Sequence, residues 1–296
     1  MDLTIIYDGF GNMKITGTTK HLCVIGDPIS HSFSPLIHNF ISEQMGLDYT
    51  YSAYWIKENE LSGAISAMRT LKITGMNVTA PHKIEVIKYI DALSDDAQKL
   101  GSVNTIVNKD GVLVGHNTDG EGFYLSLVNA GIGVTGKNIL VMGCGGVVIP
   151  MLVRIISENP KSVTILNRTM SKAETVAKTV YDITGYTLET EIKADDFDLV
   201  INTTTAGMAN QKDAFPWDSI EALKNRDFIN SGTAAVDMIY NPQKTKFLEF
   251  AEKKGAKILN GLDMLIYQAV LAYEIFTDTK LPSDIADKIR KEVFGI

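Results

Sequence analysis

The sequence predicts an α/β protein of two domains. Its 296 residues suit two domains better than one. Short apolar runs typical of buried strands alternate with helical segments, the order of elements found in a parallel sheet covered by helices. The clearest unit spans residues 138–166, where an apolar run, a glycine turn, a helical segment and a second apolar run follow one another. We expect an N-terminal open α/β domain over residues 1–118, completed by residues 261–296, and a second α/β domain over residues 119–260.

The composition is that of an ordinary soluble globular protein, with 45% hydrophobic and 21% charged residues. A formal net charge of −7 disfavours nucleic acids and anionic membranes as partners, because both require a basic face. Cys23 and Cys144 form no disulfide framework, and no cysteine or histidine spacing suggests a metal site, so we expect a reducing cytoplasm and no metal. The N-terminus does not resemble a signal peptide, and the apolar run 139–153 is too short to cross a membrane.

In the first domain, strands are expected at 21–26, 49–55 and 73–79, and helices at 34–45, 58–70 and 81–90. Because these strands and helices alternate, we expect a parallel sheet with covered faces. Asn108-Lys-Asp-Gly111 separates two further apolar runs and predicts a β-hairpin. Residues 1–19 alternate weakly around two glycines and predict another hairpin, for which the sequence suggests no role.

The glycine turn within residues 138–166 predicts a dinucleotide site. Gly143, Gly145 and Gly146 follow the apolar run 139–142 directly, and the segment 147–156 is long enough for a helix. The N–H groups at a helix N-terminus bind a pyrophosphate, and glycines let the backbone come close to it. The second domain is therefore predicted to be a doubly wound fold of the Rossmann type. A tight turn that holds no ligand is the alternative.

The residues after the next strand, 163–166, indicate which dinucleotide binds. A site for NAD carries an acidic residue there, which bonds the ribose 2′-hydroxyl. Here Asn167, Arg168 and Thr169 follow, and then Lys172, a set of cations and neutral polar groups that suits a 2′-phosphate. We therefore expect NADP as the cofactor, the alternative for Arg168 being an ordinary solvated charge.

The second domain continues with strands expected at 198–202, 234–238 and near 257–259. A helix at 262–276 is apolar nearly all round, and an amphipathic helix follows at 284–293. We expect both helices to return to the first domain, whose sheet needs helices to cover it.

Polar side chains gather at the predicted strand ends of the first domain. Ser32 and Ser34 flank the start of a helix that Pro35 can open, so their hydroxyls and the free N–H groups can bind one carboxylate. The alternative for Ser34 is a simple N-cap. Asn77 and Thr79 point to the same side of a strand, at the end where open α/β sheets bind ligands.

Three further polar residues lie at element ends. Lys83 falls in the first turn of the predicted helix 81–90, where a cation is unfavourable against the helix dipole. A lysine placed against local preference suggests a chemical role, although most lysines are simply solvated. Asn104 and Asp119 are the others, and capping of the following helix is the alternative for Asp119.

Over roughly residues 21–276 the chain resembles the shikimate dehydrogenase family. The resemblance is carried by His31-Ser-Phe-Ser-Pro35, Asn77-Val-Thr-Ala-Pro-His-Lys83, Val103-Asn-Thr105, Asn117-Thr-Asp-Gly120, Gly143-Cys-Gly-Gly146, Asn167-Arg-Thr169, Asn202-Thr-Thr-Thr-Ala-Gly207, Asp237-Met-Ile-Tyr-Asn-Pro242 and Gly261-Leu-Asp-Met-Leu-Ile-Tyr-Gln268. It implies reversible NADPH-dependent reduction of 3-dehydroshikimate to shikimate, a cytoplasmic step of chorismate and aromatic amino acid biosynthesis.

The resemblance also implies roles for residues. Lys83 and Asp119 would form the catalytic pair, and Ser32 and Ser34 with Tyr240 would hold the substrate carboxylate. The ring hydroxyls would be held by Thr79, Lys83, Asn104, Asp119 and Gln268, with Asn77 beside them. NADP would be held by Gly143, Gly145, Gly146, Val147, Asn167, Arg168, Thr169, Lys172, Thr204, Met238 and Gly261, the last two by the nicotinamide. Val147 and Val148 depart from the family, whose members usually carry small residues there.

Two other functions stay open at this point. One is a quinate/shikimate dehydrogenase that uses NAD as well as NADP. The other is a non-catalytic sensor that binds shikimate or a dinucleotide, which the presence of Lys83 and Asp119 disfavours. The sequence leaves the choice between a monomer and a homodimer open.

Overall fold

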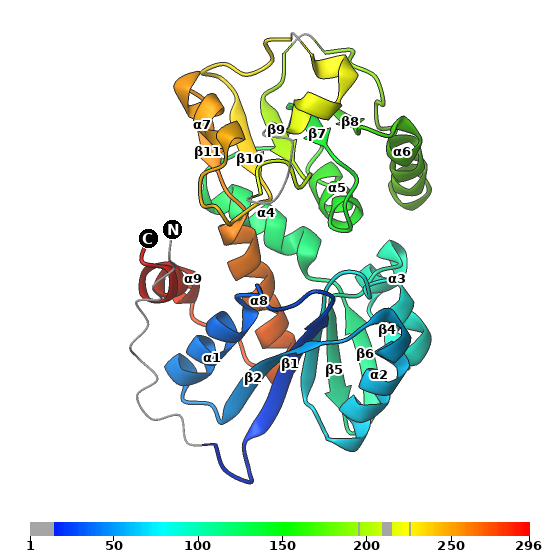
Figure 1. Cartoon of the computed structure of the whole chain (residues 1–296), viewed down its shortest axis with the longest axis vertical. Helices are drawn as coiled ribbons and strands as arrows, with labels where there is room; N and C mark the ends of the chain where they lie inside the picture. The colour runs from blue at the N-terminus through cyan, green and yellow to red at the C-terminus, as the bar shows by residue number, and fades with distance from the viewer. Residues whose placement is uncertain (1–14, 195, 209–214, 225) are drawn as a thin grey trace. The chain divides into compact units, whose positions relative to one another are not determined.

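The computed structural model describes residues 15–194, 196–208, 215–224 and 226–296, and Figure 1 shows their elements. Most of the hairpin predicted over residues 1–19 lies outside the described residues. The chain forms two compact units, one running to Thr118 and resuming over Ile266–Ile296, the other comprising Asp119–Leu265. Within the described residues, no helix combines the length and the apolar character that crossing a membrane requires.

The first unit contains a six-stranded sheet in the order β2-β1-β3-β5-β6-β4. Its strands are β1 (Lys20–Gly26), β2 (Tyr49–Trp55), β3 (Gly75–Val78), β4 (Ala92–Leu93), β5 (Thr105–Lys109) and β6 (Val112–His116). β2, β1 and β3 run parallel as predicted, but β5 is antiparallel to both β3 and β6. The sheet is therefore mixed and not wholly parallel, because the two-residue turn between β5 and β6 reverses the chain.

Alternate side chains of this sheet face different helices. Cys23, Ile25 and Met76 point to the face covered by α2 (Leu61–Thr70) and share a core with it. On the opposite face lies α8 (Leu262–Thr277), and a Cβ added to Gly75 would come within 2.2 Å of the Phe276 ring. The other helices of the unit are α1 (Ser34–Met45), η1 (Glu58–Glu60), η2 (Glu85–Tyr89), α3 (Asp95–Leu100), α9 (Ile285–Lys288) and the π-helical η5 (Ile289–Val293).

The helix predicted over residues 81–90 is wrong. Residues 81–84 form turns, and only the short 3₁₀ segment η2 follows them. His82 is buried, and its Nε2 lies 2.7 Å from the backbone oxygen of Ile56, which holds the turn to the end of β2. Several β-branched residues after it also weaken helix propensity. Lys83 consequently lies in a turn and not at a helix N-terminus.

The second unit contains a five-stranded, all-parallel sheet in the order β11-β10-β9-β7-β8. Its elements are α4 (Asp119–Asn129), β7 (Asn138–Met142), α5 (Val148–Ile156), β8 (Ser162–Leu166), α6 (Met170–Thr184), β9 (Leu199–Asn202), η3 (Pro216–Ser219), η4 (Glu221–Leu223), β10 (Ala234–Asp237), α7 (Lys246–Lys253) and β11 (Lys257–Leu259). Thr164 of β8 makes one further parallel bridge, to Glu189. With that bridge in the place of a third strand, the order is that of the Rossmann fold, as predicted.

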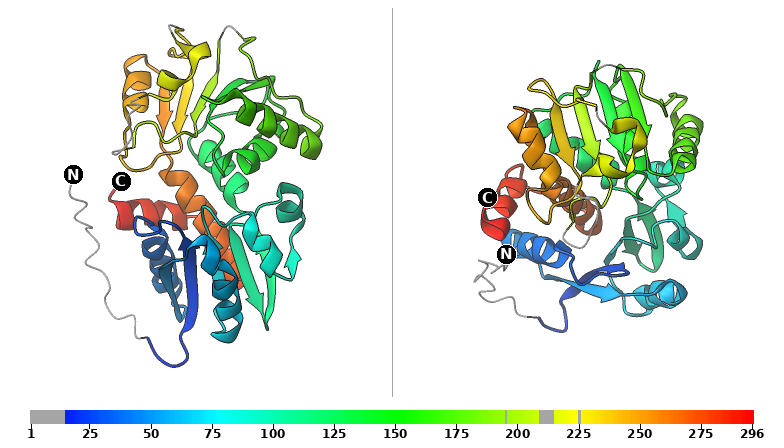
Figure 2. Two further views of the ribbon diagram at one scale, coloured as in Figure 1. Left: turned by 45° about the vertical axis from the view of Figure 1, so that its right-hand side comes forward. Right: turned by 45° about the horizontal axis from the view of Figure 1, so that its top comes forward.

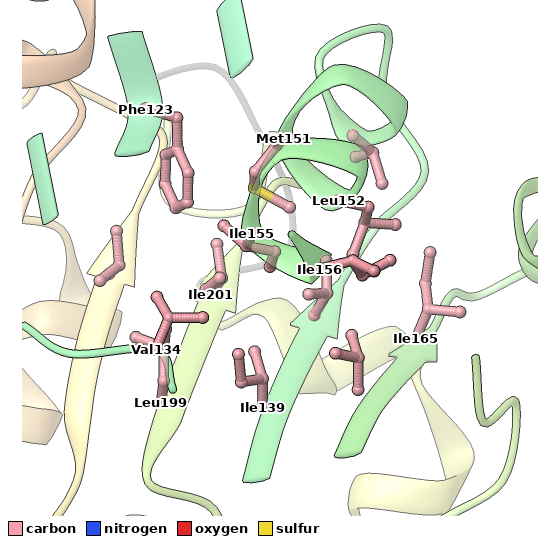
Figure 3. Packing of buried hydrophobic residues seen from close by; sticks show 14 of the residues in the cluster. Phe123, Val134, Ile139, Met151, Leu152, Ile155, Ile156, Ile165, Leu199 and Ile201 are labelled. Atoms are coloured by element: carbon pink, nitrogen blue, oxygen red, sulfur yellow. The ribbon is translucent and has the colours of Figure 1, made fainter. Parts of the chain in front are cut away.

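Each face of this sheet has its own core. Figure 2 shows the helices around the sheet, and Figure 3 shows the core on the face of α4 and α5. Ile139, Ile165 and Ile201 pack against α4, α5 and α6. The neighbouring side chains Leu140, Leu166 and Val200 point to the other face and pack against α7 and the 3₁₀ turns. The sheet is thus covered on both faces, and ligands can reach only its strand ends.

Candidate active site

A series of buried polar side chains links β2, β3 and β5 in the first unit. Tyr51 Oη donates a hydrogen bond to Asn77 Oδ1 at 2.7 Å. Asn77 Nδ2 donates to Thr105 Oγ1 at 3.0 Å and to the backbone oxygen of Asn104 at 3.1 Å. Both amide hydrogens and the amide oxygen of Asn77 are therefore engaged, so its orientation is fixed.

The series continues from Asn104 to α8. Asn104 Nδ2 donates to Thr118 Oγ1 at 2.9 Å, and the Thr118 backbone N–H donates to Asn104 Oδ1 at 2.9 Å. The Thr118 hydroxyl donates in turn to the backbone oxygen of Gln268 at 3.1 Å. The structure thus connects the predicted substrate residues Asn77, Asn104 and Gln268 through residues that lie up to 150 positions apart in the chain.

Ser34 lies near the other end of the series. Burial raises the pKa of Tyr51 well above its ordinary value and outweighs the Ser34 side chain, which lowers it, so Tyr51 stays protonated. The Ser34 backbone N–H donates to Ser32 Oγ at 3.3 Å. The N-cap alternative for Ser34 is wrong, because Ser34 is the first residue of α1 and Phe33 precedes it as the cap.

Thr79 and Lys83 lie beyond the end of β3. The backbone N–H of Thr79 donates to Ile25 of β1, and a Cβ added to Gly26 would come within 2.4 Å of the Thr79 methyl group. Lys83 is half-buried, and its backbone oxygen accepts a hydrogen bond from Val103 at 2.8 Å. These contacts fix the backbone of both predicted residues relative to β1 and β5.

The remaining predicted residues belong to the second unit. Asp119 begins α4 and is 5% exposed. Tyr240 follows β10 and is half-buried, and burial raises the pKa of its hydroxyl. Every predicted cofactor residue also lies in this unit.

The glycine turn fits a dinucleotide pyrophosphate. Gly143 has a φ of 108°, and a Cβ there would come within 2.6 Å of Thr203 Oγ1 and 2.9 Å of a Thr204 side-chain carbon. Gly145 and Gly146 are exposed. Val147 is the N-cap of α5, and no side chain caps this helix. The Val148 N–H donates to the Gly145 oxygen at 3.0 Å and Pro150 has no N–H, so within the first turn only the Ile149 N–H is left to face an anion. The turn also lies between β7 and β9, where the strand order reverses.

The end of β8 carries the predicted 2′-phosphate residues. Asn167 Nδ2 donates to the backbone oxygen of Thr169 at 2.9 Å, which shapes the turn into α6. Arg168 and Lys172 are exposed. The Lys172 charge acts on the thiol of Cys144, although burial dominates there and raises the Cys144 pKa to about 11. Lys172 is therefore close enough to the glycine turn to affect its electrostatics.

Sequence reasoning missed Tyr51, Thr105 and Thr118 as members of the site. Tyr51 and Thr105 lie within strands, where aromatic and β-branched residues are expected for packing alone. Thr105 and Thr118 do lie in two of the family motifs, Val103-Asn-Thr105 and Asn117-Thr-Asp-Gly120, so the sequence carried a signal for both but none for Tyr51. In the described part of the chain, no three His, Cys, Asp or Glu residues gather as a metal site would require.

Comparison with known proteins identifies similar chains. Residues 24–106 match the shikimate dehydrogenase substrate binding domain, residues 126–213 the shikimate/quinate 5-dehydrogenase model, and residues 261–294 the shikimate 5′-dehydrogenase C-terminal domain. A shikimate dehydrogenase (NADP(+)) of Alkaliphilus oremlandii is 40% identical, over 93% of this chain and 97% of that protein.

Two solved structures are also similar. A shikimate 5-dehydrogenase from Listeria monocytogenes, in complex with shikimate and NAD, has a TM-score of 0.82 at 33% identity and covers 94% of this chain and 98% of its own. The enzyme from Thermus thermophilus, in complex with NADP(H) and shikimate, has a TM-score of 0.79 at 31% identity and covers 93% and 100%.

Proposed function

The chain belongs to the shikimate dehydrogenase family, and we propose how its residues divide the work of the NADP(+)-dependent interconversion of shikimate and 3-dehydroshikimate. The reaction is that of an oxidoreductase acting on a CH–OH group. The observation that carries the assignment of roles is the hydrogen-bonded series from Tyr51 to Gln268 in the first unit. A site for a small polyhydroxylated acid needs such fixed donors and acceptors, because every buried polar group of ligand and protein must find a partner.

Ser32 and Ser34, with Tyr240, hold the substrate carboxylate in this proposal. The hydroxyls of Ser32 and Ser34 lie at the start of α1, where the positive end of the helix dipole also favours an anion. Thr79, Asn104 and Gln268 hold the ring hydroxyls. Asn77 holds Asn104 in place, because its Nδ2 donates to the Asn104 backbone oxygen.

Lys83 and Asp119 are the catalytic pair in this proposal. The nicotinamide of NADP supplies the hydride chemistry when it is bound. The protein must then move one proton at the C3 oxygen of the ring, and Lys83 gives or takes that proton while Asp119 orients it. Asp119 suits this task because it is buried at the start of α4, where its carboxylate has little freedom.

The glycine turn and α5 hold the pyrophosphate of NADP in this proposal, through Gly143, Gly145, Gly146 and Val147. Asn167, Arg168, Thr169 and Lys172 hold the 2′-phosphate. Thr204, Met238 and Gly261 complete the site on the nicotinamide side. The uncapped N-terminus of α5 and the two exposed cations after β8 support these roles.

Initial rates of shikimate and quinate oxidation, each with NADP and with NAD, test the proposal. We expect shikimate with NADP to give the highest kcat/KM, and NAD to be at least about tenfold poorer because Arg168 and Lys172 lose their charged partner. A second candidate, dual use of NAD, is favoured by the Listeria relative bound to NAD, and comparable rates with both cofactors would establish it. Binding of both ligands without turnover would leave the sensor as the better account.

We also propose that the reaction takes place in the cytoplasm, on a small-molecule substrate and without nucleic acid or a membrane as partner, by a monomer or a homodimer. Both cysteines of the chain are free, Cys23 being buried and Cys144 half-buried, as expected of a protein in a reducing compartment. The net charge of −7 opposes binding to nucleic acid.

A further inference from the structure

Asp237 is a fully buried carboxyl group at the end of β10 that the proposed reaction does not use. Its Oδ1 accepts hydrogen bonds from Asn202 Nδ2 at 2.9 Å and from the backbone N–H of Ile239 at 3.0 Å. Its Oδ2 accepts from Thr245 Oγ1 at 2.6 Å. All three donors are neutral, and burial raises the pKa of Asp237 to about 6. Burying a carboxyl group among neutral partners lowers the stability of the fold, which suggests that the hydrogen bonds of Asp237 have a functional role.

One arm of this cluster leads to the glycine turn. Because Asn202 turns its amide nitrogen to Asp237, its Oδ1 faces the next loop and accepts from Thr204 Oγ1 at 2.7 Å and from the Thr204 backbone N–H at 2.9 Å. Thr203 and Thr204 are the residues that a side chain at Gly143 would strike. The carboxylate thus orients the Asn202 amide, and this amide holds the loop that packs on the pyrophosphate turn.

The second arm leads to the nicotinamide side. The backbone N–H of Met238 donates to the Asn202 backbone oxygen at 2.9 Å, and Gly261 donates to Ile239 at 3.1 Å. A Cβ added to Gly261 would come within 2.2 Å of the Met238 oxygen, so these two segments are in direct contact. Since Asp237 also holds the Ile239 N–H, the same carboxylate fixes this side of the proposed cofactor site.

The third arm anchors the cluster to α7. Thr245 is the N-cap of this helix and accepts a hydrogen bond from Leu248 at 3.4 Å while donating to Asp237. Thr245 is buried and belongs to a rigid helix start. The carboxylate therefore ties the ends of β9 and β10 to the start of α7.

We infer that Asp237, through Asn202 and Thr245, is a positioning residue that sets the spacing between the pyrophosphate turn and the nicotinamide side of the cofactor site. This inference rests on the proposed function, since it assumes that NADP binds along these strand ends. A displacement of about 1 Å at a reacting centre can cost on the order of 100-fold in rate. Loss of the cluster should accordingly weaken NADP binding and slow hydride transfer while leaving shikimate binding alone.

Threonine substitutions provide a matched test. Thr245→Val removes the hydroxyl that bonds Asp237, whereas Thr245→Ser keeps it. Thr233→Val is the control, because Thr233 is equally buried just before the opposite end of β10, and its hydroxyl donates to the Phe197 backbone oxygen at 3.1 Å. Asp237→Asn tests the carboxylate itself. All four variants are purified as full chains and checked for folding by circular dichroism.

Two readouts apply. Calorimetric titration with NADP alone should show affinity lowered about tenfold in Thr245→Val and Asp237→Asn, recovered in Thr245→Ser and unaffected in Thr233→Val. The kinetic isotope effect with shikimate deuterated at C3 should rise in the first two variants, because hydride transfer becomes slower relative to the other steps. A purely structural role would lower thermal stability in Thr245→Val and Thr233→Val alike without moving either readout.

The inference is overturned if Thr245→Val and the Thr233→Val control bind NADP equally well and show the same isotope effect. Should Asp237→Asn fail to fold, the threonine pair alone decides. Failure of the proposed function looks different, because the unaltered protein would then neither bind NADP nor oxidise shikimate.

Discussion

The imidazole ring of His38 lies flat against the phenol ring of Tyr51, with centroids 4.1 Å apart and planes within 7° of parallel. The stack places the Tyr51 hydroxyl where it donates to Asn77 Oδ1, so a contact on the core side of the sheet governs a hydrogen bond in the proposed substrate site. Tyr273 of α8 contacts the same His38 ring, but its hydroxyl bonds Ser42 at 3.0 Å, outside this series.

Tyr51→Phe is expected to weaken shikimate binding. The change leaves Asn77 Oδ1 without its donor and frees the amide that supports Asn104, and such a loss of one hydrogen bond corresponds to roughly a tenfold rise in KM. Tyr273→Phe removes a hydroxyl of similar burial next to the same histidine and should leave the KM for shikimate as it is. Steady-state kinetics of both variants provides the check, and equal KM values would show that Tyr51 serves packing only.

His38→Phe is expected to make the protein more resistant to acid. Burial lowers the pKa of His38 to about 3, and neither ring nitrogen has a hydrogen-bond partner among the described residues. The unfolded chain therefore binds a proton at this histidine below its ordinary pKa of 6.5, while the folded chain does not, so stability falls as the pH falls from 6.5 toward 3. At pH 5 this difference in proton binding lowers the free energy of unfolding by about 2 kcal/mol.

Denaturant unfolding of His38→Phe and of the unaltered protein at pH 7 and pH 5 measures how much of the free energy of unfolding is lost on acidification because of His38. The variant should lose less stability between the two pH values, whatever its stability at pH 7. An equal loss in both proteins would mean that His38 is protonated in the folded state.

Lys83→Ala is expected to lower kcat far more than it raises the KM for shikimate. General acid–base catalysis typically contributes about 10²–10⁴-fold, and Lys83 is the group proposed to move the proton. Lys88→Ala is the matched control, because Lys88 is exposed on η2 and pairs only with Glu85 at 2.8 Å in the contacts given by the structure. Turnover of Lys83→Ala within about threefold of the control would exclude the assigned role.

Arg168→Asp is expected to shift cofactor preference from NADP toward NAD. The change places an acidic residue after β8, where NAD sites carry one to bond the ribose 2′-hydroxyl, and removes a cation from the 2′-phosphate. Lys161→Asp alters the same charge just before the other end of β8, where Ser162 begins the strand. The ratio of kcat/KM for the two cofactors should fall by about tenfold or more in Arg168→Asp and stay constant in the control.

Elements set by local chemistry were predictable from the sequence. The hairpin of β5 and β6 turns at Asp110 and Gly111, whose φ values of 52° and 92° are those that an Asp-Gly turn favours. The glycine turn after β7 was equally clear, because Gly143 has the positive φ that only glycine adopts freely. Both features depend on residues within a few positions of one another.

Features set by distant contacts were not predictable. The segment 81–90 looks helical by pattern, but the contact of His82 with Ile56, 26 residues away, holds it in a turn. From the sequence, Tyr51 is an ordinary aromatic residue of a strand. Only the structure shows its hydrogen bond to Asn77, which is also 26 residues away. The sequence shows that Asp237 follows the apolar run 234–236 directly. Its hydrogen-bond partners Asn202 and Thr245 can be identified only from the folded structure.

The first unit consists of two segments of the chain, and the second unit lies between them in the sequence. During synthesis the second unit is therefore complete before the first. Residues 266–296 complete it, since Tyr273 bonds Ser42 and Phe276 lies against Gly75. At roughly 5–20 residues per second, the ribosome has made all of Asp119–Leu265 some seconds before this last segment. The sheet of the second unit can therefore form first, whereas the face of β1 and β3 that α8 covers stays exposed until residues 266–296 have been made.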